Sequence, residues 1–477
     1  MDTLLLAILS ASILPFFLIF FLRKPDLTTV MVIGMIFSNV FVLAKNEFGL
    51  PEIVAASPIL LFTIPLVNHL IIKREKMIFD YPFLLMLLFV LVLLSSSIFA
   101  AADLSLALVY LLTYSVEGLF LYFVIINTVR DLPTLRHIIW VILLCGALLS
   151  SLALYQEATR DYKNDFGGLA QRDTTEAGME EGKSMEPSTQ DLDRAKGPVG
   201  EPNRWAQILT VLLPLGLFGM WRERTRFLKT TAGIATILVF IGVLLTYSRG
   251  AILAIAALVL MMTLLRYIKI YQVSIVLAVM VGLVVSSPKF MNRLDTIRGV
   301  EGLISEKSVV KPDNATKGRL TEMLASSYAF LDHPVLGVGP AQYLKVHSRK
   351  YMSNPEIALR HITNTRRAHC LYTELAAETG MIGLTVFLAI VGLLMTHLWK
   401  LRRSTLRSLP AVSGLVTSLW LSIAAYMTTA IFLHLAYQRY FWLLLALSGA
   451  AVQIASSEAA RQTSPAEGAD PEGNIRP

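Results

Sequence analysis

The sequence has few charged residues and almost no cysteine. Only 16% of its 477 residues are Asp, Glu, Lys or Arg, whereas about a quarter of the residues are charged in an average soluble domain. This scarcity excludes a disordered chain and argues strongly against a water-soluble enzyme. The two cysteines, Cys145 and Cys370, allow neither a disulfide framework nor a cysteine-based zinc site, and they leave the redox compartment undetermined.

Apolar sequence is abundant instead, at 55% hydrophobic residues. It comes in blocks of about twenty residues, and a helix of that length crosses about 30 Å of hydrocarbon. Lipid offers no hydrogen-bond partners to a backbone, so each block is predicted to be a helix. The predicted fold is an all-α polytopic membrane protein with about 12–13 transmembrane helices. The blocks lie near 4–22, 27–44, 53–72, 82–100, 104–126, 134–154, 204–221, 230–247, 250–265, 270–287, 370–398, 410–433 and 438–455.

The basic residues that give the chain its formal charge of +8 lie mostly in alternate links between these blocks. The other short links contain only Lys45, Arg249 and Arg439. The positive-inside rule therefore places the basic links in the cytoplasm, the N-terminus outside and the C-terminus inside. Because topology accounts for the positive charge, no nucleic-acid partner is predicted.

Two long polar segments interrupt the apolar blocks, and both fall on the predicted outer side. The second is basic and contains a predicted helix, 319–331, with Leu320, Met323, Leu324 and Leu331 on one stripe. We expect Leu320, Met323 and Leu324 of this stripe to pack on helices or lipid. The predicted parts are N-terminal transmembrane helices at 1–154, a polar and partly disordered outer loop at 155–203, transmembrane helices at 204–287, a large basic outer loop at 288–368, C-terminal transmembrane helices at 369–455 and a disordered cytoplasmic tail at 456–477.

Single arginines stand where outer links should carry almost no charge. Arg204 opens one helix and Arg439 another, and each is either an interfacial anchor or a cation that faces a ligand. Arg249 lies between Ser248 and Gly250 in a tight reversal, which favours the ligand-facing role.

The large outer loop adds further candidates. Arg319 opens its predicted helix, and Gly337 and Gly339 mark a sharp turn whose amides either face an anion or simply close the loop. His369 precedes the next helix, where it is either structural or a neutral general base. Glu378 lies inside that helix, so its carboxylate must pair with a partner or face water.

Neither a metal site nor a cofactor is predicted. Asp191 and Asp193 form a DxD sequence, but it lies in a mobile acidic segment with no strand before it. The outer histidines lack the close spacing of a helical metal site, and they are His333, His347, His361 and His369.

Four stretches in order, together with the many-helix frame around a large outer loop, resemble the O-antigen ligase family, which also includes O-antigen and exopolysaccharide polymerases and protein ligases. They are RAKGPVGEPNRWAQIL, LLTYSRGAI, KGRLTEMLASSYAFLDHPVLGVGPAQY and RRAHCLYTELAAETGMIGL, and the resemblance covers roughly 190–400. It implies a GT-C-type bundle that moves a glycan, without metal, from polyprenyl (undecaprenyl) diphosphate to an acceptor hydroxyl. It also implies a multi-pass protein of the bacterial inner membrane, with its active site on the periplasmic face. The implied acceptor is a glycan, lipid A-core or a protein, with membrane lipid as a further partner.

The resemblance also implies roles for particular residues. It matches His369, Arg319 and Arg249 to catalytic positions, and it matches Arg194 to the basic residue ahead of the GxxGxPN stretch. It leaves Arg204, Arg439, Gly337, Gly339 and Glu378 as candidates for binding the diphosphate or the glycan. Cys370 stands where the family usually has Asn after the histidine.

Competing functions stay open at this level. A ligase and a polymerase share the donor chemistry and differ only in the acceptor. A secondary transporter of an anionic lipid-linked solute also suits many helices with arginines, although internal repeats are not visible in the sequence. An inactive assembly partner would require that the outer arginines tolerate loss of charge.

Overall fold

The computed structural model describes residues 21–51, 54, 57–172, 194–274, 314–359, 365–434 and 438–463. Within these ranges the chain is built of helices, and its only extended pairing is an isolated bridge between Gln171 and Gly197. Each predicted apolar block that falls in these ranges is helical. The prediction of an all-α polytopic membrane protein is therefore confirmed.

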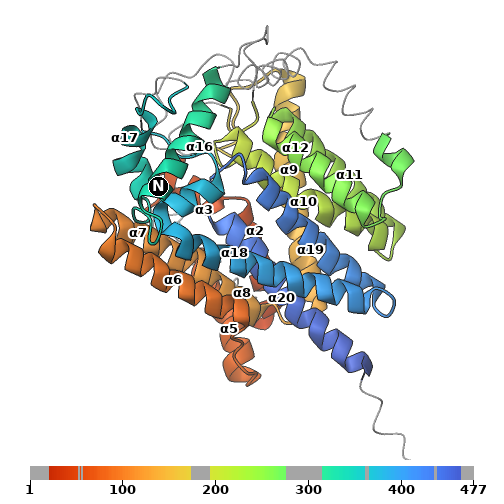
Figure 1. Cartoon of the computed structure of the whole chain (residues 1–477). Helices are drawn as coiled ribbons and strands as arrows, with labels where there is room; N and C mark the ends of the chain where they lie inside the picture. The colour runs from red at the N-terminus through yellow and green to blue at the C-terminus, as the bar shows by residue number, and fades with distance from the viewer. Residues whose placement is uncertain are drawn as a thin grey trace, which may run out of the picture.

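The first half of the chain supplies helices α2 to α9 (Figure 1). The helix α2 (Pro25–Phe37) is bent by 53° against α3 (Val40–Asn46). The remaining elements of this half are η1 (Ser57–Phe62), α5 (Thr63–Val67), η2 (Asn68–Ile72), α6 (Tyr81–Phe99), α7 (Leu104–Tyr114), η3 (Ser115–Phe120), α8 (Leu121–Thr128) and α9 (Leu132–Thr159).

The second half supplies the helices that carry most of the candidate residues. They are α10 (Pro202–Arg222), α11 (Arg226–Leu245), α12 (Arg249–Leu264), α16 (Asn314–Asp332), η5 (Tyr343–His347), α17 (Ser348–Met352), α18 (Leu371–Thr405), α19 (Pro410–Thr429) and α20 (Gln438–Thr463). Short polar side chains cap several starts, since Asp80, Asp131 and Ser248 accept hydrogen bonds from amides three residues on.

Seven described helices are long and apolar enough to cross a membrane, or eight if the bent pair α2–α3 is one span. The predicted first block and most of the block at 270–287 lie outside the described residues. Helix η1–η2 and helix α12 are apolar but shorter than a typical span. The predicted total of 12–13 spans therefore stays a prediction.

Helices α19 and α20 form the centre of the bundle, and most of their surface is buried. Helix α18 runs across them and also packs on α6 and α16, while α10 packs on α11 and α19. Helices α16 and α17 lie together over the N-terminal end of α18 (Figure 1). This arrangement places α16 and α17, which belong to the loop predicted at 288–368, on one end of the bundle.

Part of the predicted apolar stripe of α16 packs inward, because Leu324 lies against the buried cluster that includes Ala325, Ala329 and Tyr343. The fully buried face of α16 carries small and polar residues, namely Thr321, Glu322, Ala325, Ser326 and Ala329, whereas Leu331 at the end of the stripe is 66% exposed. Small and polar side chains therefore let α16 approach α18 closely.

The predicted tail also begins later than residue 456, because α20 continues to Thr463. In its extra turns, an ion pair between Arg461 and Glu458 spans one helical turn. Most of the predicted mobile segment 165–193 lies outside the described residues.

Candidate functional site

The loop after α16 inserts into a break in α18. Gly380 interrupts that helix with φ 66° and ψ −167°, a conformation that is essentially restricted to glycine. The amide of Met381 donates to the carbonyl of Pro334 at 2.8 Å, and the amide of Val338 donates to the carbonyl of Ala377 at 2.8 Å. A Cβ atom at Gly380 would lie 2.1 Å from the carbonyl oxygen of Val335, so the close approach of the two backbones requires glycine.

The two candidate glycines of this loop have their amides engaged within the protein. The amide of Gly337 donates to the carbonyl of His333 at 3.1 Å, and the amide of Gly339 donates to the carbonyl of Glu378 at 3.0 Å. Both residues also have positive φ angles, as a sharp turn requires. Of the two alternatives left open by the sequence, this arrangement corresponds to closing the loop.

The candidate Glu378 belongs to the same junction. Its side chain is buried, and its carboxylate accepts hydrogen bonds from the backbone amides of Ala341 and Tyr343. Its backbone carbonyl accepts a hydrogen bond from Ser96 of α6 as well as from Gly339. Glu378 therefore fixes the loop on α18, which meets the requirement that a carboxylate inside a membrane helix must have partners.

An imidazole and a buried carboxylate meet beside this junction. The Nε2 atom of His369 lies 3.6 Å from Oε2 of Glu322 on α16, and the side chain of Glu322 is only 1% exposed. Arg366 donates from its guanidinium to Oε1 of the same carboxylate at 3.3 Å. His369 has a φ angle of 50°, which is uncommon for a residue with a side chain and marks a backbone held by its surroundings.

A second histidine extends this cluster. The ring of His434 stacks parallel to that of His369, with centroids 6.0 Å apart. Arg204 donates hydrogen bonds to the imidazole and the carbonyl oxygen of His434. Arg367 contacts the same ring at 3.3 Å and pairs with Glu374 at 3.0 Å. Cations and imidazoles from α10, the segment before α18 and the segment after α19 are thus gathered in one place.

Arg194 connects the start of α10, which carries Arg204, to the turn after α11. Its Nε atom donates to the carbonyl of Thr246 at 2.8 Å, and its terminal nitrogen donates to Asn203 at 2.9 Å. The carboxylate of Glu201 accepts from Asn203 and from the amide of Arg204. The GxxGxPNR stretch therefore ties the start of α10 to the turn between α11 and α12.

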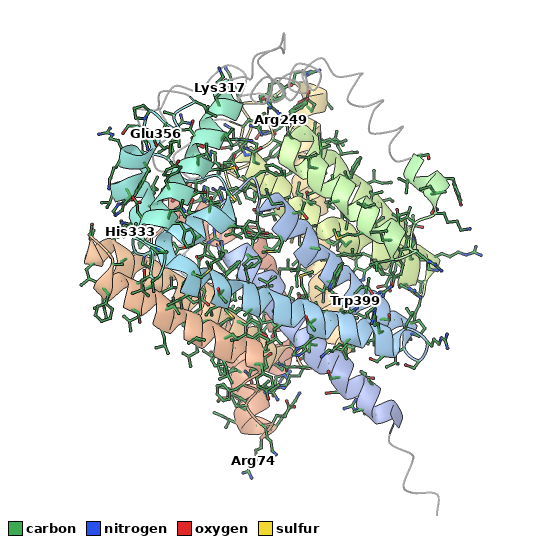
Figure 2. The ribbon with its side chains drawn as sticks, viewed as in Figure 1. Arg74, Arg249, Lys317, His333, Glu356 and Trp399 are labelled. Atoms are coloured by element: carbon green, nitrogen blue, oxygen red, sulfur yellow. The ribbon has the colours of Figure 1, made fainter. Side chains whose placement is uncertain are left out.

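Arg249 follows that turn as the first residue of α12, and its side chain is partly exposed. A Cβ atom at its neighbour Gly250 would lie 3.4 Å from Phe432, which is two residues from His434. Arg319 is also partly exposed, lies one turn before Glu322 on α16, and forms no ion pair with another described residue. Figure 2 shows Arg249 at the same end of the molecule as Lys317 of α16, with Arg74 at the opposite end.

Arg439 is placed differently. Its guanidinium donates to the side chain of Asn39 at 2.6 Å and lies 3.7 Å from Glu117 of η3. Asn39 in turn donates to the carbonyl of Pro198. The described polar contacts of Arg439 are thus with the N-terminal helices, and Asn39 links it to the GxxGxPN stretch.

Sequence reasoning missed four members of the cluster, namely Glu322, Arg367, Glu374 and His434. Glu322 lies within the quoted KGRLTEML stretch, three residues after Arg319, and this helical spacing was the available signal. His434 gave no signal, because its partner Arg204 is 230 positions away. Among the described residues, no three His, Cys, Asp or Glu side chains converge as a metal site would require.

The hydroxyl group of Tyr343 lies against α16, where it donates to the backbone carbonyl of Glu322 at 3.3 Å. Burial, together with the nearby carboxylates of Glu374, Glu322 and Glu378, raises the pKa of this phenol well above its ordinary value. Tyr343 therefore stays a neutral hydrogen-bond donor, which keeps Glu322 in place beside His369.

Residues 234–388 match a family model described as O-antigen ligase. The matched range contains Arg249, Arg319, Gly337, His369 and Glu378, so it covers the insertion into α18 and the imidazole–carboxylate contact. No curated protein matches the chain. The resemblance read from the sequence is confirmed over this part of the chain: the match supports assignment to the O-antigen ligase family, and with it a membrane glycosyltransferase of the ligase or polymerase type.

Proposed function

We propose that this member of the O-antigen ligase family transfers a glycan from a polyprenyl diphosphate carrier to an acceptor hydroxyl. The transfer takes place at the outer face of the membrane and needs no metal ion. The observation that carries the proposal is the contact between His369 and Glu322 at an end of the bundle where arginines from several helices also gather.

The reaction needs stabilisation of a leaving group. When the bond between the anomeric carbon and the diphosphate oxygen breaks, its electron pair stays on that oxygen and the carrier gains negative charge. Guanidinium groups that are already in place stabilise this charge more in the transition state than in the ground state. We assign this role to Arg249 and Arg319, because both are partly exposed and Arg249 lies at the same end of the molecule as Lys317 of α16, which is two residues before Arg319.

The reaction also needs removal of a proton. His369 accepts the proton of the acceptor hydroxyl, whose oxygen then forms the new bond to the anomeric carbon. Glu322 lies beside Nε2 of the imidazole, where its negative charge stabilises the imidazolium that forms when His369 takes up the proton. Glu322 is therefore a positioning residue and His369 the catalytic one.

The other candidate arginines have supporting roles in this proposal. Arg204 and Arg194 already bind His434, Asn203 and the carbonyl of Thr246. They hold the start of α10 against the turn before α12, and thereby fix the position of Arg249. Arg439 positions the N-terminal helices through its contacts with Asn39 and Glu117.

Purified protein in lipid nanodiscs, given a defined polyprenyl-diphosphate glycan and separate candidate acceptors, provides the test. We expect glycan transfer in the presence of a metal chelator, its loss in His369→Ala, and its retention in Arg226→Ala, a control at the far end of α10 and α11. A lipid A-core acceptor identifies a ligase, and a second lipid-linked glycan identifies a polymerase. Movement of the substrate across the bilayer without a new glycosidic bond would refute the proposal in favour of a transporter.

A further inference from the structure

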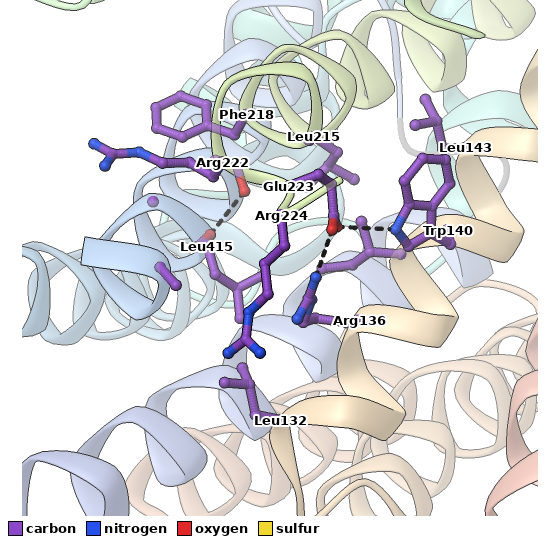
Figure 3. A pocket seen from close by; sticks show the side chains of 15 residues that line it. Leu132, Arg136, Trp140, Leu143, Leu215, Phe218, Arg222, Glu223, Arg224 and Leu415 are labelled. Carbon is purple, nitrogen blue, oxygen red and sulfur yellow. Dashed lines mark hydrogen bonds and ion pairs between the residues drawn. The ribbon is translucent and has the colours of Figure 1, made fainter. Parts of the chain in front are cut away.

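A cavity of about 120 Å³ lies between α9, α10 and α19, far from the histidine cluster (Figure 3). Each helix contributes residues spaced three or four apart, so one face of each helix lines the hollow. The lining residues are Leu132, Arg136, Ile139, Trp140 and Leu143 of α9, Leu215, Phe218, Gly219 and Arg222 of α10, Glu223 and Arg224 after it, and Ala411, Gly414, Leu415 and Ser418 of α19. The wall is therefore apolar inside and basic at one edge.

The cavity contains one carboxylate, and that carboxylate is already neutralised. Glu223 is 8% exposed, accepts a hydrogen bond from Arg136 at 2.6 Å and accepts another from the indole nitrogen of Trp140 at 3.1 Å. Figure 3 shows both bonds converging on the Glu223 side chain. One arginine is thus used to balance the single acid of the cavity.

Two further guanidinium groups at this cavity have no carboxylate partner among the described residues. Arg222 and Arg224 are exposed, and neither forms an ion pair with another described residue. The stem of Arg222 lies against α19, where its Cγ would be 3.2 Å from a Cβ atom built on Gly414. The edge of the cavity therefore carries two positive charges next to an apolar wall.

The position of the cavity separates it from the proposed transferase site. Helix α10 has 21 residues, so its two ends are about 30 Å apart, the thickness of the hydrocarbon layer. Arg204 in the histidine cluster lies at one end and Arg222 at the other. The link at the cavity end holds Arg222, Arg224, Arg226 and Lys229, which by the positive-inside rule makes it the cytoplasmic end.

We propose that this cavity binds one anionic phospholipid of the cytoplasmic leaflet. The lipid phosphate lies between Arg222 and Arg224, where each guanidinium donates charge-assisted hydrogen bonds to its oxygens. An acyl chain follows the apolar wall past Leu215 and Phe218, and Trp140 lies at the level of the headgroup. Charge complementarity selects the occupant, because a neutral or zwitterionic lipid leaves the positive edge uncompensated.

The experiment uses the full chain in phosphatidylcholine nanodiscs and tryptophan quenching by lipids with brominated acyl chains. We expect brominated phosphatidylglycerol to quench more strongly than brominated phosphatidylcholine, with the difference lost in Trp140→Phe. Arg222→Gln with Arg224→Gln should weaken the preference for phosphatidylglycerol by roughly five-fold for each arginine. Arg226→Gln is the matched control, since it removes an exposed arginine of the same link that does not line the cavity.

A second variant covers the case in which the double variant does not fold. Ala411→Phe narrows the cavity from α19, leaves both arginines in place and adds no tryptophan, so it should abolish the lipid preference as well. Equal quenching by both lipids in the native protein would overturn the proposal. An equal loss in Arg226→Gln, or displacement of the lipid by inorganic phosphate alone, would also overturn it, because these results indicate general surface charge or a soluble anion site.

Discussion

The Nε2 atom of His369 lies 3.6 Å from the Oε2 atom of Glu322, although His369 belongs to the segment just before α18 and Glu322 to the middle of α16. The carboxylate is buried and also receives a hydrogen bond from Arg366. A buried carboxylate at this distance fixes the orientation of the imidazole, provided that α16 keeps its place on α18. The contact therefore links the position of the outer loop to the proposed chemistry.

Replacing Glu322 tests its positioning role. Glu322→Gln keeps the shape of the side chain but removes the charge, so we expect kcat for glycan transfer to fall by about ten-fold or more while KM changes little. Glu322→Asp should recover part of the loss. A rise in KM with kcat unchanged would show that Glu322 serves substrate binding instead.

Arg249 and Arg319, the two residues proposed to bind the diphosphate, carry planar guanidinium groups that can form two parallel hydrogen bonds to phosphate oxygens. Arg249→Ala and Arg319→Ala should each lower kcat/KM on the order of a hundred-fold, which corresponds to about 3 kcal/mol of transition-state stabilisation. Arg249→Lys and Arg319→Lys keep the charge but lose the two parallel hydrogen bonds, so only partial activity is expected. Steady-state kinetics in nanodiscs measure both effects, and full activity in both alanine variants would contradict the assignment.

Because the loop inserts into α18 at Gly380, we expect alanine to destabilise the protein at Gly380 but not at Gly392 of the same helix. Gly380→Ala should destabilise the protein by about 1–3 kcal/mol, because the new Cβ meets a backbone carbonyl at a positive φ angle. Gly392→Ala is the control, since no atom lies within 4 Å of a Cβ built there. Thermal unfolding followed by size-exclusion chromatography measures both, and equal stability of the two variants would argue against the inserted loop.

The orientation in the membrane can be tested with single cysteines in a background that lacks Cys145 and Cys370. Glu356→Cys, which is exposed near α17, should react with a membrane-impermeant maleimide in intact cells. Arg224→Cys should react only after the membrane is opened. The reverse pattern would invert the predicted topology and place the histidine cluster on the cytoplasmic side.

Much of the candidate site could be read from the sequence because it lies in short motifs. The tight reversal before Arg249 is a turn that ends in the cap Ser248, and the GVG turn closes the loop on α18. The same reasoning could not tell whether Gly339 donates to an anion or to Glu378, because that depends on a contact between two segments. It also missed His434, whose role arises only from its stacking on His369.

Hydropathy and the distribution of Lys and Arg determined from the sequence alone that the chain is a bundle of membrane helices, and they predict which ends face the cytoplasm. Both signals are local, since each depends on residues within one span or one link. Only the tertiary structure decided which charges meet. It paired Glu322 with His369 and Arg204 with His434, and left Arg222 and Arg224 beside an apolar cavity. Such pairings depend on how distant helices cross, and no periodicity within a single helix specifies that crossing.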